Sequence, residues 1–205
     1  MYFRKFVVGE MANNNYLLID NHEAALIDCT GDIPELDSVL NENNAELKYI
    51  LLTHSHFDHI AGVKKIQDKY NVTVCIHEAD KKSLETTNDF MYAVGLPAID
   101  IPSVDRLLHD GDKISLGNVD IEVIHLPGHT LGGVGYKVDN MIFSGDTVFL
   151  GSVGRTDLPG GDYSTIVDTV KNKIFMLDDK TILYPGHGAD TTVEYEKKYN
   201  IILDN

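Results

Sequence analysis

The sequence contains only two cysteines, Cys29 and Cys75, and they lie too far apart to form a C-x-x-C pair. A chain of 205 residues buries roughly 70% of the surface that its unfolded form exposes, so it needs no disulfide for stability. Two isolated cysteines fit a reducing compartment better than a disulfide framework. Both have apolar neighbours, and we expect them to be small buried side chains.

Basic residues are also scarce, with 17 Lys and Arg against 32 Asp and Glu and a formal net charge of −15. An acidic protein repels phosphate backbones and anionic lipid, which disfavours nucleic-acid and membrane partners. No apolar run approaches the ~20 residues that span a bilayer, and the N-terminal segment has no hydrophobic core of signal-peptide length. The sequence therefore predicts a cytoplasmic protein with a small-molecule partner, and no feature indicates an oligomeric state.

Linker-like Gly/Ser or Pro tracts and short repeats are absent, so we expect one domain over residues 1–205. Short apolar runs typical of strands are followed by helical patterns, and this order occurs twice along the chain. The run at 47–52 is a predicted buried strand, and a predicted helix follows it. This order predicts an α/β fold in which two mixed sheets face each other with helices outside, a four-layer sandwich.

Two local expectations concern helix boundaries. Asp32, three residues before Glu35, forms the pattern of a capping box ahead of apolar residues at helical spacing. Residues 87–104 include Pro97 and Pro102, and we expect them to form a loop.

The densest group of potential metal ligands lies in Thr53-His54-Ser55-His56-Phe57-Asp58-His59. His54 and His56 are two residues apart, so in an extended chain both imidazoles leave the same side. Imidazole is the commonest neutral ligand for zinc-class metals. Asp58 and His59 follow where the strand turns into a helix, from which their side chains reach the opposite side of a shared cavity. One peptide can therefore supply ligands to two adjacent metals.

Three later turns each place one potential ligand at the end of an apolar strand. They are Leu126-Pro127-Gly128-His129-Thr130, Phe143-Ser144-Gly145-Asp146-Thr147 and Tyr184-Pro185-Gly186-His187-Gly188. A lone histidine in such a turn is more often structural, but three such turns would collect at one rim of the sandwich. Asp28 also ends a predicted strand, and we expect it to orient the metal ligands without binding the metal itself.

The motifs T-H-S-H-F-D-H, P-G-H-T, S-G-D-T and P-G-H-G, in this order, resemble those of the metallo-β-lactamase-fold hydrolases. Within that superfamily the chain most resembles the small glyoxalase II-like, or hydroxyacylglutathione hydrolase-like, group. The match runs over nearly the whole chain and is far more specific for the fold than for the substrate. The resemblance implies the αβ/βα sandwich of the metallo-β-lactamase fold.

The resemblance also implies that seven side chains hold two metal ions. The implied sets are His54, His56 and His129 for one metal, Asp58, His59 and His187 for the second, and Asp146 as a bridge. Three ligands per metal plus a bridge leave an open position for water. Two cations ~3.5–4 Å apart lower the pKa of that water. Because His and Asp sites accept several metals, we expect zinc first, with iron and manganese as alternatives.

The implied reaction is hydrolysis of a thioester by a metal-bound hydroxide, with one metal stabilising the oxyanion. A thiolate, with a pKa near ~8.5, departs without a strong general acid. Asp58 is also the candidate catalytic residue that takes the proton from the attacking water. Only 18 residues (205 − 187) follow His187, whereas full-length glyoxalase II has a helical C-terminal domain that helps to hold glutathione. Two interpretations of the substrate therefore stay open: a hydroxyacylglutathione-like thioester, or an S-acyl conjugate of a smaller or different thiol.

Arg155 lies in a G-R-T-D segment similar to those of glyoxalase II-like proteins and of the related persulfide dioxygenases. Two interpretations are open. Its guanidinium either binds a substrate carboxylate in a fork geometry or forms an internal ion pair, for example with Asp157.

Three other functions remain alternatives on the same residues. A persulfide dioxygenase would hold a single iron through His54, His129 and Asp146, and the presence of His187 favours hydrolysis instead. A lactone hydrolase would use the same two-metal site on a different ester. A metal-binding module without catalysis is the third alternative.

Overall fold

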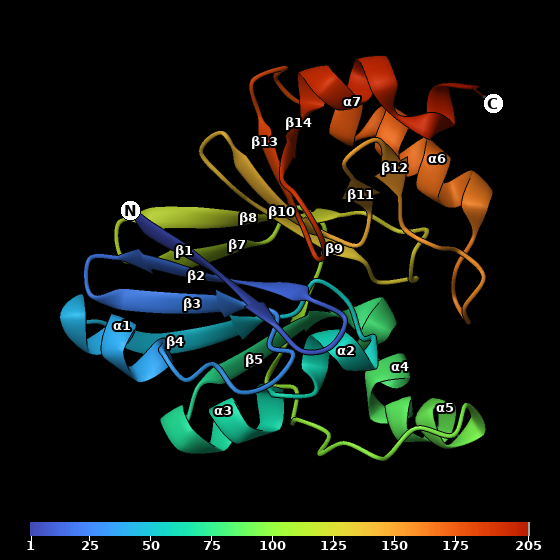
Figure 1. The fold of residues 1–205 in the computed structure, drawn as a ribbon. Helices are drawn as coiled ribbons and strands as arrows, with labels where there is room; N and C mark the ends of the chain where they lie inside the picture. The colour runs from blue at the N-terminus through green and yellow to red at the C-terminus, as the bar shows by residue number, and fades with distance from the viewer. Residues whose placement is uncertain (205) are drawn as a thin grey trace.

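The computed structural model describes residues 1–204, and Figure 1 shows two β-sheets that face each other between two groups of helices. One sheet has the order β1-β2-β3-β4-β5-β6. Its strands are β1 (Tyr2–Val8), β2 (Asn13–Asp20), β3 (Glu23–Ile27), β4 (Glu46–Leu51), β5 (Thr73–His77) and β6 (Arg106–Leu108). The helices on its outer side are α1 (Leu36–Glu42), α2 (Phe57–Ile60), α3 (Val63–Tyr70), α4 (Lys81–Glu85) and α5 (Thr87–Ala93).

The second sheet has the order β14-β13-β10-β9-β8-β7. Its strands are β7 (Lys113–Leu116), β8 (Val119–His125), β9 (Val134–Val138), β10 (Met141–Gly145), β13 (Ile182–Pro185) and β14 (Thr191–Thr192). Helices α6 (Tyr163–Asn172) and α7 (Val193–Tyr199) cover its outer face, and β11 (Val148–Phe149) pairs with β12 (Ser152–Val153) beside it. Short 3-10 helices span Glu78–Asp80, Ile174–Met176 and Ile201–Asp204. The predicted four-layer α/β sandwich is confirmed.

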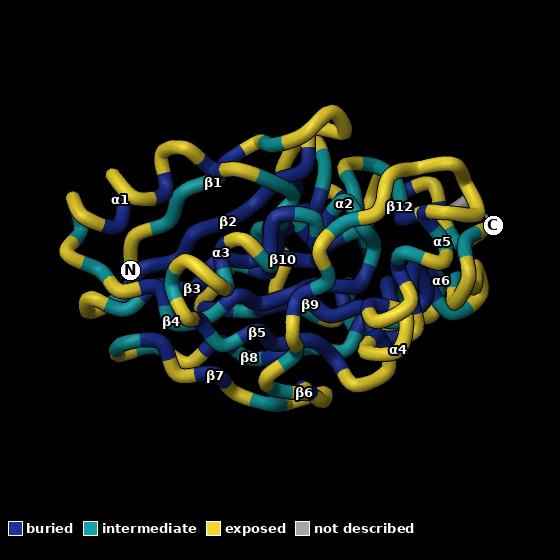
Figure 2. The backbone as a smooth tube through the Cα atoms, turned by 90° about the horizontal axis from the view of Figure 1, so that it is seen from below, coloured by how far each residue is buried: buried dark blue, intermediate teal, exposed yellow. Residues whose placement is uncertain are grey.

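Three apolar clusters fill the spaces between the four layers, as the buried central strands in Figure 2 indicate. Strand β2 shows how the sequence builds them, because successive side chains point to opposite faces of a strand. Leu17 packs against the helices outside the first sheet, whereas Leu18 packs between the two sheets. Both faces are therefore apolar, and the strand reads as a continuous hydrophobic run.

Strand direction decides where the connecting loops meet. Strands β3, β4, β5 and β6 are parallel, and β10 is parallel to β13. Strand β9 runs antiparallel to both β8 and β10, so β8, β10 and β13 share one direction. Their carboxyl ends therefore lie at one edge of the second sheet.

The expected capping box is absent, and the loop expected at 87–104 is shorter than predicted. Helix α1 begins at Leu36 with Glu35 as its N-cap and no side-chain capping bond; Asp32 instead pairs with Lys65 at 2.6 Å. Residues 87–93 form helix α5, which ends ahead of Gly95 in the left-handed region, so both prolines fall beyond it. Among the helices within residues 1–204, none combines the length and apolar character needed to cross a membrane.

Candidate metal centre

The predicted ligands all follow the carboxyl ends of strands. His54 and His56 come after β4, and His56 is the N-cap of the one-turn helix α2, which carries Asp58 and His59. The predicted change from strand to helix within this segment is thus present. The turns after β8, β10 and β13 carry the three remaining ligand candidates, His129, Asp146 and His187.

The structure brings all seven side chains together in three overlapping groups whose potential ligand atoms lie within 4.8 Å of one another. The groups are His54, His56 and His129; His54, His59 and Asp146; and Asp58, His59 and His187. The first and third groups coincide with the two sets that the resemblance implies. Asp146 lies between them, as a bridging carboxylate must.

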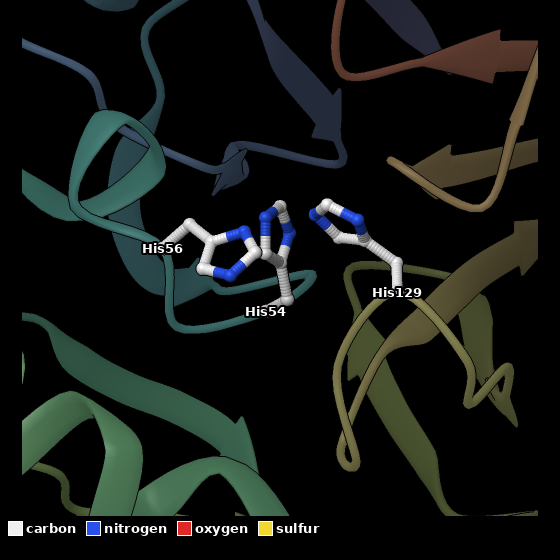
Figure 3. Close-up of side chains that lie close together, drawn as sticks. All are labelled: His54, His56 and His129. Atoms are coloured by element: carbon white, nitrogen blue, oxygen red, sulfur yellow. The ribbon is translucent and has the colours of Figure 1, made fainter. Parts of the chain in front are cut away.

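Imidazole rings from separate loops face one another in the first group. The ring centroids of His54 and His56 are 4.8 Å apart and nearly perpendicular, and His129 lies 4.5 Å from His56 and 4.8 Å from His54. Figure 3 shows the rings of His54 and His56, from one loop, beside the ring of His129, from another. The third group also contains two facing imidazoles, because the rings of His59 and His187 lie 5.3 Å apart.

Several nitrogens at the centre are buried without a hydrogen-bond partner among the described residues. These nitrogens are Nε2 of His54, His59 and His129. Among the described residues, Oδ1 of Asp146 is likewise buried without a hydrogen-bond partner. His59 Nε2 lies 3.5 Å from the Asp146 carboxylate, and His129 Nε2 lies 3.6 Å from it. Burying polar atoms without partners is costly, and four such atoms facing one space indicate a site shaped for cations. The residues therefore fit the two metal ions that the sequence predicts.

The opposite ring nitrogens fix the tautomers of these histidines. His129 Nδ1 lies 2.7 Å from the carbonyl oxygen of Arg155, and His187 Nδ1 lies 3.0 Å from that of Met11. A carbonyl oxygen can only accept, so in both rings Nδ1 donates and Nε2 carries the lone pair. This is the orientation that metal-binding histidines adopt.

Asp28 sets the tautomers of His54 and His59 in the same way. Its Oδ2 lies 2.7 Å from His59 Nδ1 and accepts a hydrogen bond from Thr53 Oγ1 at 2.7 Å. Because the Thr53 hydroxyl proton is directed at Asp28, Thr53 Oγ1 can only accept from His54 Nδ1, 3.0 Å away. Asp28 is buried and was predicted as a supporting residue, and the structure places it there.

Burial and neighbouring charge shift the pKa values of these groups in opposite directions. Burial, followed by the neighbouring His59 and His56, lowers the pKa of His54 well below its ordinary value. Burial and His129 lower the pKa of His56 to about 4. Burial alone would lower the pKa of His59, but Asp146 and Asp28 raise it well above the ordinary value. The neutral histidines and ionised carboxylates that a cation requires are favoured at His54, His56 and Asp146.

Gly186 leaves the room that the two metal sets need. A Cβ at this position would lie 2.2 Å from Asp146 Oδ1 and 2.6 Å from His59 Cε1. Any side chain here would therefore collide with the predicted bridge and with a ligand of the second metal. This explains the glycine in the P-G-H-G motif.

Asn13 is a functional residue that the sequence did not reveal. Its side chain is fully buried, and its Nδ2 donates to Asp58 Oδ2 at 2.7 Å and lies 3.2 Å from His187 Nε2. It thus contacts two of the three predicted ligands of the second metal. It stands first in a run of three buried asparagines at the start of β2, and such a run in an apolar strand is the signal that points to it.

Asp80 is a second such residue, and it joins two ligand loops. One carboxylate oxygen accepts from the Ser55 amide at 3.0 Å and from Thr130 Oγ1 at 2.9 Å, and the other accepts from the Gly132 amide at 2.6 Å. Asp80 is buried among these donors. It ties the segment that carries His54 and His56 to the loop that carries His129. No spacing in the sequence indicates this connection.

Arg155 takes the second of its two predicted arrangements. Its Nε and Nη2 bind the two carboxylate oxygens of Asp157, each at 2.7 Å. The Asp157 pair raises the pKa of Arg155, and Arg155 lowers the pKa of Asp157 to about 2. The backbone of Arg155 contributes separately, through its carbonyl contact with His129.

The model of the metallo-beta-lactamase superfamily matches residues 8–187, which include all seven predicted ligands. The chain belongs to this superfamily. Hydroxyacylglutathione hydrolase GloC of Haemophilus influenzae is 35% identical over 203 residues, which cover 97% of this chain and 96% of that protein.

Two solved structures match along the whole chain or nearly the whole chain. The BLEG-1 B3 metallo-beta-lactamase gives a TM-score of 0.90 at 33% identity and covers 100% of both chains. TTHA1623, solved in a di-iron-bound form, gives a TM-score of 0.84 at 35% identity and covers 97% of this chain and 98% of its own. The predicted family and fold are confirmed, and the chain is a metallo-hydrolase of the superfamily.

Proposed function

We propose that this chain is a binuclear metallohydrolase that cleaves a small-molecule thioester. The observation that carries the proposal is the arrangement of ligands: two sets of three, on either side of Asp146, with lone pairs at Nε2 directed into one space. The full-length similarity to a hydroxyacylglutathione hydrolase supports thioesters as the substrate class.

Each set of residues has a defined part in this proposal. Two divalent ions, zinc first with iron or manganese as alternatives, would polarise the carbonyl and lower the pKa of a bound water. His54, His56 and His129 would hold one ion, Asp58, His59 and His187 the other, and Asp146 both. Hydrolysis breaks the C–S bond and forms a C–O bond to water, and the water's protons end on the thiol and on the carboxylic acid or solvent. The thiolate is a good leaving group, so no strong general acid is required.

Asp58 has two predicted roles, and its contacts bear on both. Its Oδ2 accepts a hydrogen bond from the Asn13 amide and lies 3.2 Å from His187 Nε2, and this proximity supports a ligand role in the second set. We propose the ligand role as its main one, with proton transfer from the attacking water as its second. Arg155 would contact a substrate carboxylate only after releasing Asp157. Cytoplasmic residence, predicted from the two unpaired thiols, is part of the same proposal.

A second candidate is β-lactam hydrolysis, which the similarity to BLEG-1 favours. A single-iron oxygenase would need only His54, His129 and Asp146. Such an oxygenase would not use Asp58, Asn13 and His187, although the fold brings these three side chains into contact.

Thiol release from acyl thioesters, followed in parallel with β-lactam ring opening and oxygen uptake on a persulfide, tests the proposal. We expect thioester hydrolysis that His59→Ala reduces at least a hundredfold, together with loss of metal from the second set. Unchanged metal content and unchanged rates in His59→Ala would point to a metal-binding module without catalysis. Oxygen uptake with one iron per chain would replace the hydrolase by the dioxygenase alternative.

A further inference from the structure

Phe57, the residue between the predicted ligands His56 and Asp58, lines two cavities. The first has a volume of 310 Å³ and is lined by His56, Phe57, residues of α4 and α5, and the loop at Leu158 and Pro159. The second has a volume of 300 Å³ and is lined by Asp58, Phe57, Leu96 and the turn between β1 and β2. Each cavity therefore reaches one set of predicted metal ligands, and Phe57 contributes to the lining of both.

Neither cavity offers a cation to an anionic substrate group. No Lys or Arg is among the described residues that line either of them. Both contain a carboxylate: Asp89 in the first, and Glu10 besides Asp58 in the second. Arg155, the basic residue predicted to bind substrate, already holds Asp157 through two hydrogen bonds. A carboxylate in either cavity would thus find no basic side chain to pair with, and it would lie near Asp89 in the first cavity or Glu10 in the second.

The first cavity combines apolar walls with polar groups, one of which is buried without a partner among residues 1–204. Phe57, Phe90, Leu158 and Pro159 provide the apolar surface. The hydroxyls of Thr86 and Thr87 are taken up by backbone carbonyls at 3.0 Å and 3.1 Å. Ser55, by contrast, is 1% exposed, and its hydroxyl has no hydrogen-bond partner among the described residues. The lining thus combines apolar surface with hydroxyl groups and the Asp89 carboxylate, which suits an uncharged chain.

We propose that the substrate is a thioester whose acyl and thiol arms are both free of negative charge, one in each of the two cavities that Phe57 lines. This inference rests on the proposed thioesterase function and narrows it. The carbonyl carbon of a thioester carries two arms, and the two cavities reach the ligand segment at nearby residues, one at His56 and the other at Asp58.

A matched panel of synthetic thioesters tests the two arms separately. Lactoyl thioesters of N-acetylcysteamine, which is neutral, and of glutathione, which is anionic, differ only in the thiol. Propionyl and succinyl thioesters of N-acetylcysteamine differ only in the acyl group. We expect kcat/KM of the native protein to be at least about tenfold higher for the neutral member of at least one pair, and never higher for the anionic member. Added salt should narrow the difference, because it screens the repulsion.

Asp89→Asn removes the carboxylate of the first cavity at nearly constant volume. We expect it to raise kcat/KM about threefold or more for the anionic member of one pair, while the neutral member changes less than twofold. Glu85→Gln is the matched control: it removes a negative charge at the end of α4, outside the cavity lining, where Glu85 lies 3.7 Å from Lys81. Glu85→Gln should leave the ratio of kcat/KM between the neutral and the anionic member unchanged in both pairs.

The outcomes separate this inference from the function on which it rests. If thioesters are hydrolysed but the anionic members are equal or better substrates, or if Asp89→Asn leaves both ratios unaltered, the inference is wrong and the thioesterase function stands. If the metal-loaded protein hydrolyses none of the four thioesters, the proposed function fails and the inference fails with it.

Discussion

Asp28 Oδ2 lies 2.7 Å from His59 Nδ1, and the same oxygen accepts the hydroxyl hydrogen of Thr53 at 2.7 Å. Through Thr53 it also orients His54, whose Nδ1 lies 3.0 Å from the Thr53 hydroxyl. His54 and His59 belong to different predicted metal sets. One buried carboxylate therefore fixes the tautomers of ligands on both sides of the candidate centre.

Replacing Asp28 tests this relationship. Asp28 has a positive φ of 57°, which asparagine tolerates better than alanine, so Asp28→Asn removes the charge with little backbone strain. The variant loses one of the two carboxylate oxygens that orient His59 and Thr53. We therefore expect metal affinity to fall about 10–100-fold. Competition with a chromogenic chelator measures this. An affinity equal to that of the native protein would show that the Asp28 contact has no influence on the metals.

Asp80→Ala should lower stability because it leaves three donors without an acceptor, namely the Ser55 and Gly132 amides and the Thr130 hydroxyl. Each unsatisfied buried donor costs about 1–3 kcal/mol, so we expect the free energy of unfolding to fall by about 3 kcal/mol or more. Urea denaturation with excess metal measures this. The exposed Asp100 provides the control, and Asp100→Ala should differ from the native protein by less than about 0.5 kcal/mol. Equal effects of the two substitutions would contradict a joining role for Asp80.

Gly154→Ala should displace the bridging carboxylate. A Cβ at this position would lie 1.8 Å from the backbone oxygen of Asp146 and 3.1 Å from His129 Nδ1, so the chain around both predicted ligands must move. We expect bound metal to fall to less than half of the native content at equal chain concentration. At Gly31 a Cβ would meet only Val8 at 3.5 Å, an ordinary contact, and Gly31→Ala should retain its metal. Normal metal content in Gly154→Ala would show that this loop adapts without disturbing the centre.

Asn13→Ala should weaken the second metal set more than the first. Its amide contacts Asp58 and His187, both of which belong to that set. We expect metal stoichiometry under limiting metal to fall from two toward one per chain, with the overall fold retained in circular dichroism. The exposed Asn41 on α1 offers a control, and Asn41→Ala should bind the native amount. Equal loss from both sets would place Asn13 in a general structural role.

The fold was predictable where a pattern repeats over several residues. The apolar run at 47–52 corresponds to β4 and its continuation, with Leu51 and Leu52 fully buried, because apolar runs between turns form central strands. Boundaries set by single contacts were not predictable. Asp32 has the spacing of a capping residue, but Lys65, which is close only in the folded chain, binds its carboxylate instead.

The ligand loops were predictable because histidines and a carboxylate at the ends of strands make a pattern along the sequence. The residues that position them were found less completely. Asp28 could be predicted because it ends a strand. Asp80 could not, because it binds Ser55 and Gly132, which are 25 and 52 positions away in the sequence. Its role arises from the packing of two separate loops around one carboxylate, and no local pattern encodes such a meeting.

The proposal that this chain is a binuclear thioesterase is tested most directly by metal analysis and thioester hydrolysis on one sample. We expect close to two divalent ions per chain, hydrolysis with one thiol released per thioester cleaved, loss of activity on chelation and recovery when metal is restored. One iron per chain together with oxygen uptake on a persulfide and no thioester cleavage would contradict it.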